Sequence, residues 1–261
     1  MSLLCSCLSF GPVQCDFIDP EMETGVADND LRLWGIGTNR TMRVHWMLAE
    51  LDLDYELRPI GPRTGETLSE EFLRLNPKHK IPLLEHGAFV ISESSAIIAY
   101  LSETFAAPEG FFVPRDEKGR ARLNEWCSFV MMELDAGSLY VIRRHEQLSE
   151  IYGEAPRAVE AARQYFSQQI ECMIERFGND PAPLMPEGMS IADILLETCV
   201  DFALSLDIDM PQRLIAHRAR LMDRPAYRRA FHANYPERTP PNFADGERPQ
   251  PRKSNRKQMN Q

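Results

Sequence analysis

The residues best suited to binding a small polar ligand stand in one short stretch, residues 76–101. A helical pattern begins near residues 92–95, and a helix N-terminus presents unpaired backbone N–H groups that bind carboxylate or phosphate. Ser94 adds a hydroxyl, Glu93 adds an acceptor for an ammonium group, and Lys80 adds a cation one strand away. These groups suit a zwitterion with a carboxylate at each end and an amine at one end. The alternative is a core helix that is capped only for stability.

A hairpin and a helix must position these groups. The apolar run at residues 82–84 predicts a short buried strand, and residues 88–91 predict its antiparallel partner after a turn. Apolar residues then recur on one helical face, at Ile97, Ile98, Leu101 and Phe105. We expect Ser92 to be the N-cap of this helix and Glu93 to lie in its first turn, where the helix dipole favours an anion.

The order of motifs in this stretch resembles the glutathione-binding half of the cytosolic glutathione transferase family. Residues 76–82 carry the pattern N-P-x-x-K-I-P, and residues 93–97 carry E-S-x-x-I about ten positions later. By this resemblance, Pro82 follows a cis peptide bond. The resemblance also implies that the backbone of Ile81 pairs with the cysteinyl part of glutathione.

The remaining ligand contacts are implied by the same resemblance. Glu93 and Ser94 would hold the γ-glutamyl end, and Lys80 would hold the glycyl carboxylate. Glutathione enters as a co-substrate, and no metal is expected. Arg63 and Thr67, in a loop rich in glycine and proline, are further candidates for a ligand carboxylate.

A hydroxyl near the start of the first helical pattern is the candidate for activating sulfur. In the theta, zeta and tau types of the family, a serine stands six residues before the apolar member of an R-V pair. Here that pair is Arg43-Val44 and the residue is Thr38. A hydroxyl that donates to sulfur at a helix N-terminus stabilises the thiolate, and lowering its pKa by about two units corresponds to roughly 2.7 kcal/mol. Asn39 is the second candidate, and both residues could instead only cap the helix.

Protein thiol chemistry is disfavoured, since residues 38–41 include no cysteine. The pair Cys5-x-Cys7 is too closely spaced for a zinc site. We expect the three later cysteines to be inert core residues, because they lie in apolar helical patterns: Cys127, Cys172 and Cys199.

Composition excludes several classes of function. The net charge of −10 and the pI near 5.2 argue against a nucleic-acid binder. No apolar run approaches about 18 residues, so we expect no membrane span. The later cysteines suggest a reducing compartment, and with the resemblance to cytosolic proteins we expect a cytoplasmic location. With 43% hydrophobic residues, the 261-residue chain can bury one or two cores.

The predicted fold is an α/β thioredoxin-like N-terminal domain followed by an all-α helical-bundle C-terminal domain. The order β-α-β-α-β-β-α covers residues 31–106, a linker covers 107–115, and helical patterns fill 116–235. Residues 1–30 are expected to be a disordered leader, with Met22 as a candidate start, and 236–261 a disordered tail.

The predicted helical domain carries one clear motif and several weaker candidates. Ser190 and Asp193 form a variant capping box, with Met189 and Ile194 as a hydrophobic staple. The run from Arg143 to His145 fits either selection of an anionic substrate or a solvated face. Loose candidates for an electrophile pocket, each also compatible with the core, are Phe129, Val130, Met132, Glu133 and Tyr140.

By resemblance, the protein is a homodimeric glutathione transferase that joins the glutathione thiolate to a small hydrophobic electrophile, as in detoxification. Two alternatives stay open. One is a specialised glutathione-dependent isomerase, dehalogenase or ether-cleaving enzyme of the same fold. The other is a non-catalytic module that docks on protein partners.

Overall fold

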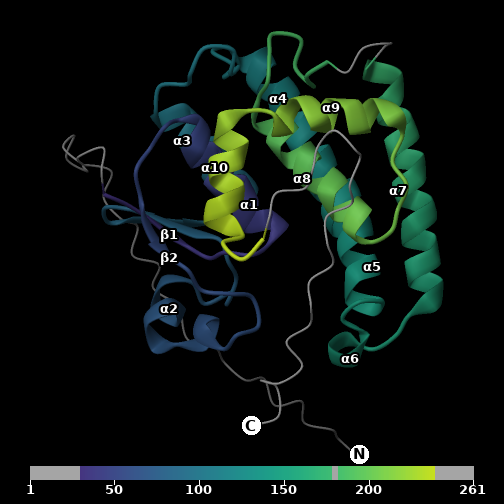
Figure 1. Ribbon diagram of the computed structural model, residues 1–261, viewed down its shortest axis with the longest axis horizontal. Coiled ribbons are helices and arrows are strands. Elements are labelled where there is room, and N and C mark those ends of the chain that lie inside the picture. The colour runs from purple at the N-terminus through teal and green to yellow at the C-terminus, as the bar shows by residue number, and fades with distance from the viewer. Residues whose placement is uncertain (1–29, 178–181, 239–261) are drawn as a thin grey trace, which may run out of the picture.

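The computed structural model describes residues 30–177 and 182–238, and Figure 1 shows a sheet-containing half beside a helical half. The leader expected over residues 1–30 and the tail expected over 236–261 lie almost entirely outside the described residues. The predicted fold class is confirmed: a thioredoxin-like unit with a four-stranded mixed sheet comes first, and a helical region follows.

The sheet has the strand order β2-β1-β3-β4. Strand β1 (Leu31–Trp34) runs parallel to β2 (Glu56–Arg58) and antiparallel to β3 (Leu83–His86). The hairpin partner β4 (Phe89–Ser92) closes the other edge. The predicted hairpin is therefore present, with both strands placed one or two residues later than the apolar runs indicated.

The register aligns one residue from each strand in a row across the sheet. Trp34 pairs with Arg58 on one side and with Leu83 on the other, and Leu83 pairs with Ser92. Because β1 and β2 are parallel, the segments after both strands leave from the same end of the sheet. The segment before β3 and the segment after β4 meet at that end too.

Helices cover both faces of the sheet (Figure 1). Leu31 and Leu33 face the main core with α1 (Asn39–Glu50) and α3 (Ser94–Thr104). The alternate residue Trp34 points to the other face, which a 3₁₀ turn, η1 (Glu66–Leu68), and α2 (Glu70–Leu75) cover. There Trp34 meets Phe72 edge to face, with ring centroids 5.7 Å apart.

The expected capping of α3 was wrong by one residue. Ser92 is the last residue of β4, and Glu93 is the N-cap, with φ +75° and no side-chain capping hydrogen bond. The hairpin register keeps Ser92 paired with Leu83, so the helix starts only at Ser94. As a result, the side chain of Glu93 accepts no hydrogen bond from the backbone N–H groups at the start of α3.

Within the described residues, all named elements after α3 are helices. One long run comprises α4 (Glu117–Phe129), the π-helical segment η2 (Val130–Leu139) and α5 (Tyr140–His145). The remaining helices are α6 (Ser149–Tyr152), α7 (Pro156–Phe177), α8 (Ile191–Ser205), α9 (Gln212–Met222) and α10 (Pro225–Asn234).

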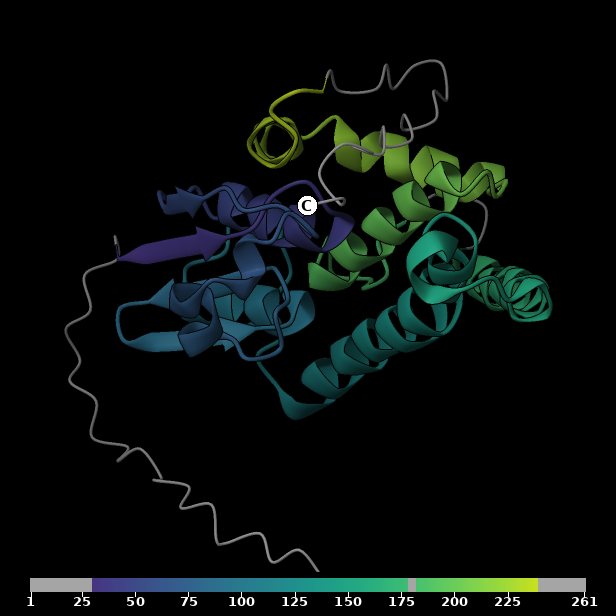
Figure 2. The same ribbon diagram turned by 90° about the horizontal axis from the view of Figure 1, so that it is seen from below.

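The last described helix returns to the first domain, and Figures 1 and 2 both show α10 beside α1. Tyr227 packs edge to face on the buried Trp46, with ring centroids 4.9 Å apart. Arg224 forms a two-pronged ion pair with Glu50, both N–O distances being 2.7 Å. An apolar contact and a charged contact thus fix α10 on α1.

The predicted capping box at α8 is confirmed. Asp193 accepts the backbone N–H of Ser190 at 2.8 Å, and its other oxygen accepts the N–H of Leu184, also at 2.8 Å. Asp193 is fully buried and serves the fold.

One of the three cysteine predictions was wrong. Cys199 is buried and Cys127 half-buried, and burial raises the pKa of each thiol to about 12. Cys172 is exposed on α7 instead. Over residues 30–177 and 182–238, no helix is both long enough and apolar enough to cross a membrane.

Candidate functional site

Thr38 caps α1 through a reciprocal pair of hydrogen bonds with Thr41. Its Oγ1 accepts the N–H of Thr41 at 2.9 Å, and its own N–H donates to Thr41 Oγ1 at 2.9 Å. The Thr41 hydroxyl donates to Asn234 Oδ1, which at 2.6 Å is its nearest acceptor. Thr38 Oγ1 therefore keeps its own hydrogen, which it gives either to Thr41 Oγ1 at 2.9 Å or to a ligand beyond the helix end.

Asn234, the last residue of α10, holds the loop before α1 in place. Its Oδ1 accepts the N–H of Gly37 at 3.0 Å, and its Nδ2 donates to the carbonyl of Thr38 at 3.0 Å. Its backbone carbonyl also accepts the Gly37 N–H, at 2.8 Å. The side chain is fully buried. Sequence reasoning missed Asn234, because nothing in its local sequence distinguishes it from an ordinary residue at a helix end.

Asn39, the second candidate for contact with sulfur, is already engaged. Its Oδ1 accepts a hydrogen bond from the hydroxyl of Tyr235 at 3.1 Å. This bond leaves the two N–H groups of the Asn39 amide as its available donors. Both sulfur candidates thus lie together at the start of α1, and each has a donor to offer.

The peptide bond between Ile81 and Pro82 is cis, as the resemblance implied. Ile81 lies directly against the end of β1: a Cβ added to Gly35 would stand 2.7 Å from Ile81 Cβ and 2.9 Å from Thr41 Cγ2. Only glycine, with φ +117° here, permits this close approach. The segment around Pro82 is thereby brought beside the start of α1.

The two charged candidates are exposed, and one has a partner that was not expected. Lys80 contributes its carbonyl to Asn76 Nδ2 at 2.7 Å, and its side chain is exposed. Glu93 pairs with Lys78 Nζ at 2.7 Å, with both side chains at least half exposed. Solvent weakens such a pair, so Glu93 can exchange Lys78 for the ammonium of a ligand at little cost.

Ser94, the first residue of α3, is buried and oriented by an arginine. Its Oγ accepts a hydrogen bond from Arg43 Nη1 at 3.2 Å. The Ser94 hydroxyl therefore has its own hydrogen free to donate elsewhere. Sequence reasoning used Arg43 only as a marker for Thr38 and missed this contact.

Arg43 is fully buried and connects the two halves of the molecule. Its Nε donates to Thr198 Oγ1 on α8 at 2.7 Å, and its Nη2 donates to Asp135 on η2 at 2.8 Å. Arg40 pairs with the second oxygen of Asp135 at 2.5 Å. One carboxylate thus serves two guanidinium groups, and burial of the pair is offset by hydrogen bonds at both ends.

The charge on Asp135 is maintained despite its burial. Burial acts to raise the pKa of this carboxyl, but Arg43 and Arg40 together outweigh burial, and the pKa is lowered. An ionised Asp135 holds Arg43 against Ser94. A carboxylate in the helical half therefore orients a hydroxyl at the proposed ligand end of the sheet.

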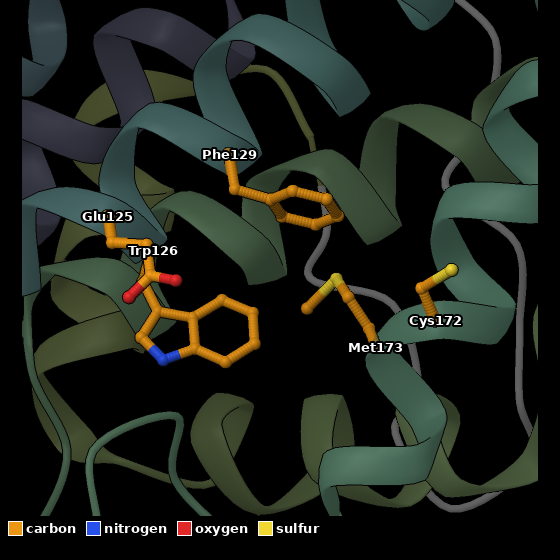
Figure 3. A pocket seen from close by; sticks show the side chains of 5 residues that line it. All are labelled: Glu125, Trp126, Phe129, Cys172 and Met173. Atoms are coloured by element: carbon orange, nitrogen blue, oxygen red, sulfur yellow. The ribbon is translucent and has the colours of Figure 1, made fainter. Parts of the chain in front are cut away.

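A separate pocket of about 190 Å³ lies between α4 and α7, away from these residues. Figure 3 shows Trp126 and Phe129 of α4 on one side and Met173 and Cys172 of α7 on the other. None of the predicted site residues except Phe129, a loose candidate, lines it. Among the other loose candidates, Val130 is buried in the core and Met132 is 64% exposed.

Comparisons with known proteins show which proteins this chain resembles. Residues 29–103 match the family model described as the N-terminal domain of glutathione S-transferase. Glutathione S-transferase theta-1 of Bos taurus is 28% identical over 148 residues, which are 56% of this chain and 61% of that protein. Human glutathione S-transferase theta-2 is 30% identical over 142 residues, 54% of this chain and 57% of the relative. The chain thus spans about three fifths of the length of the curated relatives it matches.

Solved structures match over more of the chain. A glutathione transferase homologue from Lodderomyces elongisporus, with two glutathione molecules per subunit, has a TM-score of 0.69 at 21% identity. The match covers 78% of this chain and 98% of that one. A theta-class enzyme from Xanthomonas axonopodis with glutathione bound has a TM-score of 0.64 at 22% identity, covering 77% and 97%. At these identities the structures establish the fold.

By the family model, residues 29–103 are a glutathione S-transferase N-terminal domain, and the chain as a whole has the fold of the glutathione transferase structures.

Proposed function

We propose that this chain is a glutathione transferase that moves the glutathione thiolate onto an electrophilic carbon of a small hydrophobic molecule. One observation carries the proposal: the row formed by Trp34, Leu83 and Ser92 gathers three segments at one end of the sheet. These segments hold Thr38, the Ile81-Pro82 bond and the start of α3. The protein acts as a cytoplasmic homodimer.

The thiolate is stabilised at the start of α1. Thr38 donates its hydroxyl hydrogen to the sulfur, since its oxygen already accepts the N–H of Thr41. Asn39 stands next to it with free amide N–H groups. The positive end of the helix dipole adds to both effects and lowers the pKa of the bound thiol.

The rest of glutathione lies along the neighbouring segments. The backbone of Ile81, beside Pro82, pairs with the cysteinyl unit. Glu93 and Ser94 hold the γ-glutamyl end, Ser94 through the hydroxyl hydrogen that Arg43 leaves free. The glycyl carboxylate is held by Lys80, an exposed residue two positions before Pro82.

The reaction needs no other group from the protein. The sulfur lone pair forms a C–S bond with the electrophilic carbon, and the bond to the leaving group breaks with its electron pair. Binding both reactants side by side supplies proximity, and thiolate stabilisation raises the fraction of reactive sulfur at neutral pH.

Calorimetric titration with glutathione and the ultraviolet absorbance of the bound thiolate test this function. We expect saturable binding and a thiol pKa about two units below its value in water. Thr38→Ala should raise the pKa of the bound thiol and lower kcat, whereas Thr38→Ser should restore both. Thr104→Ala, at an exposed position at the end of α3, is the matched control.

The outcomes separate the classes of function. An absence of heat with millimolar glutathione, together with complete flow-through on immobilised glutathione, would exclude the transferase and favour a docking module. Normal binding with an unchanged thiol pKa in Thr38→Ala would move the role to Asn39, which the Asn39→Ala variant then checks.

A further inference from the structure

Four arginines gather beside the start of α1, and we call Arg40, Arg63, Arg143 and Arg144 the arginine cluster. Burial lowers the pKa of Arg143, and the nearby cations of Arg63 and Arg40 lower it further. Arg143 also feels the charge of Tyr235, whose hydroxyl lies 3.1 Å from Asn39 Oδ1. The cluster therefore borders the helix end to which the thiolate is assigned.

The arginine cluster has too few neighbouring carboxylates to neutralise its positive charge. Arg40 shares the carboxylate of Asp135 with the buried Arg43. Within residues 30–177 and 182–238, no carboxylate lies at ion-pairing distance from Arg63, Arg143 or Arg144. This local excess of cations stands out in a chain whose net charge is −10.

Two of the cluster's guanidinium groups have buried nitrogen atoms that are unsatisfied. The Nε atoms of Arg143 and Arg144 are buried and make no hydrogen bond with any described residue. A buried, charged donor without an acceptor destabilises the fold, and a ligand that supplies an acceptor would offset this cost. An anion bound here would supply both the charge and the acceptor oxygens.

Aromatic rings fix the guanidinium planes. Arg144 lies over the rings of Tyr152 and Tyr140, at 4.4 and 5.9 Å from their centroids, and Arg40 lies over Tyr140 at 4.6 Å. Arg143 lies over Phe202 at 5.6 Å. Stacking uses the faces of the guanidinium groups and leaves their N–H edges for the planar, two-pronged recognition of a carboxylate.

We propose that the arginine cluster binds a carboxylate on the electrophile, so that the preferred substrates are aromatic acids with an electrophilic carbon. This inference rests on the proposed transferase function and specifies its substrate class. Arg143 and Arg144 are the specificity-determining residues. The carboxylate itself does not react: the thiolate sulfur bonds to the ring carbon, and the halide there leaves with the bonding electrons.

A pair of aryl chlorides tests the proposal: 4-chloro-3,5-dinitrobenzoate and its neutral amide, 4-chloro-3,5-dinitrobenzamide. After correction for the uncatalysed rates, we expect kcat/KM for the acid to exceed that for the amide by about tenfold or more. Arg143→Met should remove most of this preference while keeping the contact with Phe202. Arg143→Lys should keep part of it, because the charge remains without the two-pronged geometry.

Two further variants complete the set. Arg144→Met gives a second test of the cluster in case Arg143→Met fails to fold. Arg157→Met, which removes an exposed arginine on α7, is the control and should leave the acid-to-amide ratio unchanged. The KM for glutathione is measured in each variant.

Three results would overturn the proposal. One is equal turnover of the acid and the amide by the unmodified protein. Another is an equal loss with both substrates in Arg143→Met and Arg144→Met. A rise in the KM for glutathione with an unchanged acid-to-amide ratio would assign the cluster to the glutathione carboxylate instead.

A binding experiment separates this proposal from the proposed function. The unreactive 3,5-dinitrobenzoate is titrated into the protein without glutathione. Binding that is lost in Arg143→Met, with no turnover of either chloride, would reject the transferase and keep the anion site. Turnover of the amide without binding of 3,5-dinitrobenzoate would keep the transferase and reject the anion site.

Discussion

Asn234 and Thr41 stand 193 residues apart in the sequence and share a 2.6 Å hydrogen bond. The same amide holds the N–H of Gly37 and the carbonyl of Thr38. The end of the last described helix thus braces the residue to which we assign thiolate stabilisation. A change at the end of α10 should therefore alter the chemistry at the start of α1.

We predict that Asn234→Ala lowers the free energy of unfolding by about 1–3 kcal/mol, because Thr41 and Gly37 lose a buried acceptor. The same variant should weaken glutathione binding, since the loop holding Thr38 is freed. Urea unfolding and calorimetry measure the two effects. His232→Ala, at an exposed position on the same helix, should change neither. Full affinity in Asn234→Ala would refute the bracing role.

The ion pair of Arg43 and Asp135 should be strongly coupled. Removing either partner leaves an uncompensated buried charge, and we expect Arg43→Met or Asp135→Leu alone to cost about 3–5 kcal/mol. The double variant should lose far less than the sum, although Arg40 then lacks its partner. A double-mutant cycle from chemical denaturation gives the coupling energy. Additive losses would show that the pair acts independently.

Glutathione binding should also depend on the pair of Arg43 and Asp135, because this pair orients the Ser94 hydroxyl. Asp135→Asn keeps the shape of the side chain but removes the charge that holds Arg43. We expect a higher KM for glutathione in this variant, because the Ser94 hydroxyl loses its fixed orientation. Steady-state kinetics with varied glutathione measure the effect, and Asp209→Asn on the surface loop before α9 is the control. An unchanged KM would confine Asp135 to a structural role.

Buried His45 should make stability fall in mild acid. Burial lowers its pKa from 6.5 to about 4, and it stays neutral between the hydroxyl of Tyr55 and the carbonyl of Gly35. Between pH 6.5 and 4 the unfolded chain binds a proton that the folded protein does not, so stability decreases as pH falls. The contribution lost by pH 5 is about 2 kcal/mol.

Comparing the protein with His45→Gln isolates this effect from other titrating groups. The stability difference between the two should shrink by about 2 kcal/mol from pH 7.5 to pH 5, measured by urea unfolding. His79→Gln removes an exposed histidine and serves as the control. A difference that stays constant with pH would show that His45 binds a proton as readily in the folded protein as in the unfolded chain.

The capping box at α8 should stabilise the helical half, and Asp193 should contribute more than Ser190. Ser190→Ala should cost roughly 1 kcal/mol. Asp193→Ala should cost more, because the buried N–H groups of Ser190 and Leu184 both lose their acceptor. Thermal unfolding measures both variants. Equal melting temperatures for the two would contradict the double role of Asp193.

The local sequence predicted many of the elements and carried the resemblance to the family. The spacing from Asn76 to Pro82 and from Glu93 to Ile97 carried the resemblance, and the Ser190 box was found where the pattern placed it. These features depend on neighbours within a few residues, which a sequence displays directly. The ends of the elements also depended on pairing between strands, since the pairing of Ser92 with Leu83 shifted the start of α3 by one residue.

Tertiary structure alone decided which distant groups meet. Asn234 reaches the loop before α1, Asp135 holds Arg43 against Ser94, and Arg143 joins Arg63 beside Tyr235. Each contact joins residues on different elements, and its energy comes from burial and paired charge that exist only once the helices pack. The sequence specifies which chemical groups are present. The packing of the two halves determines the distances between these groups and their charge states.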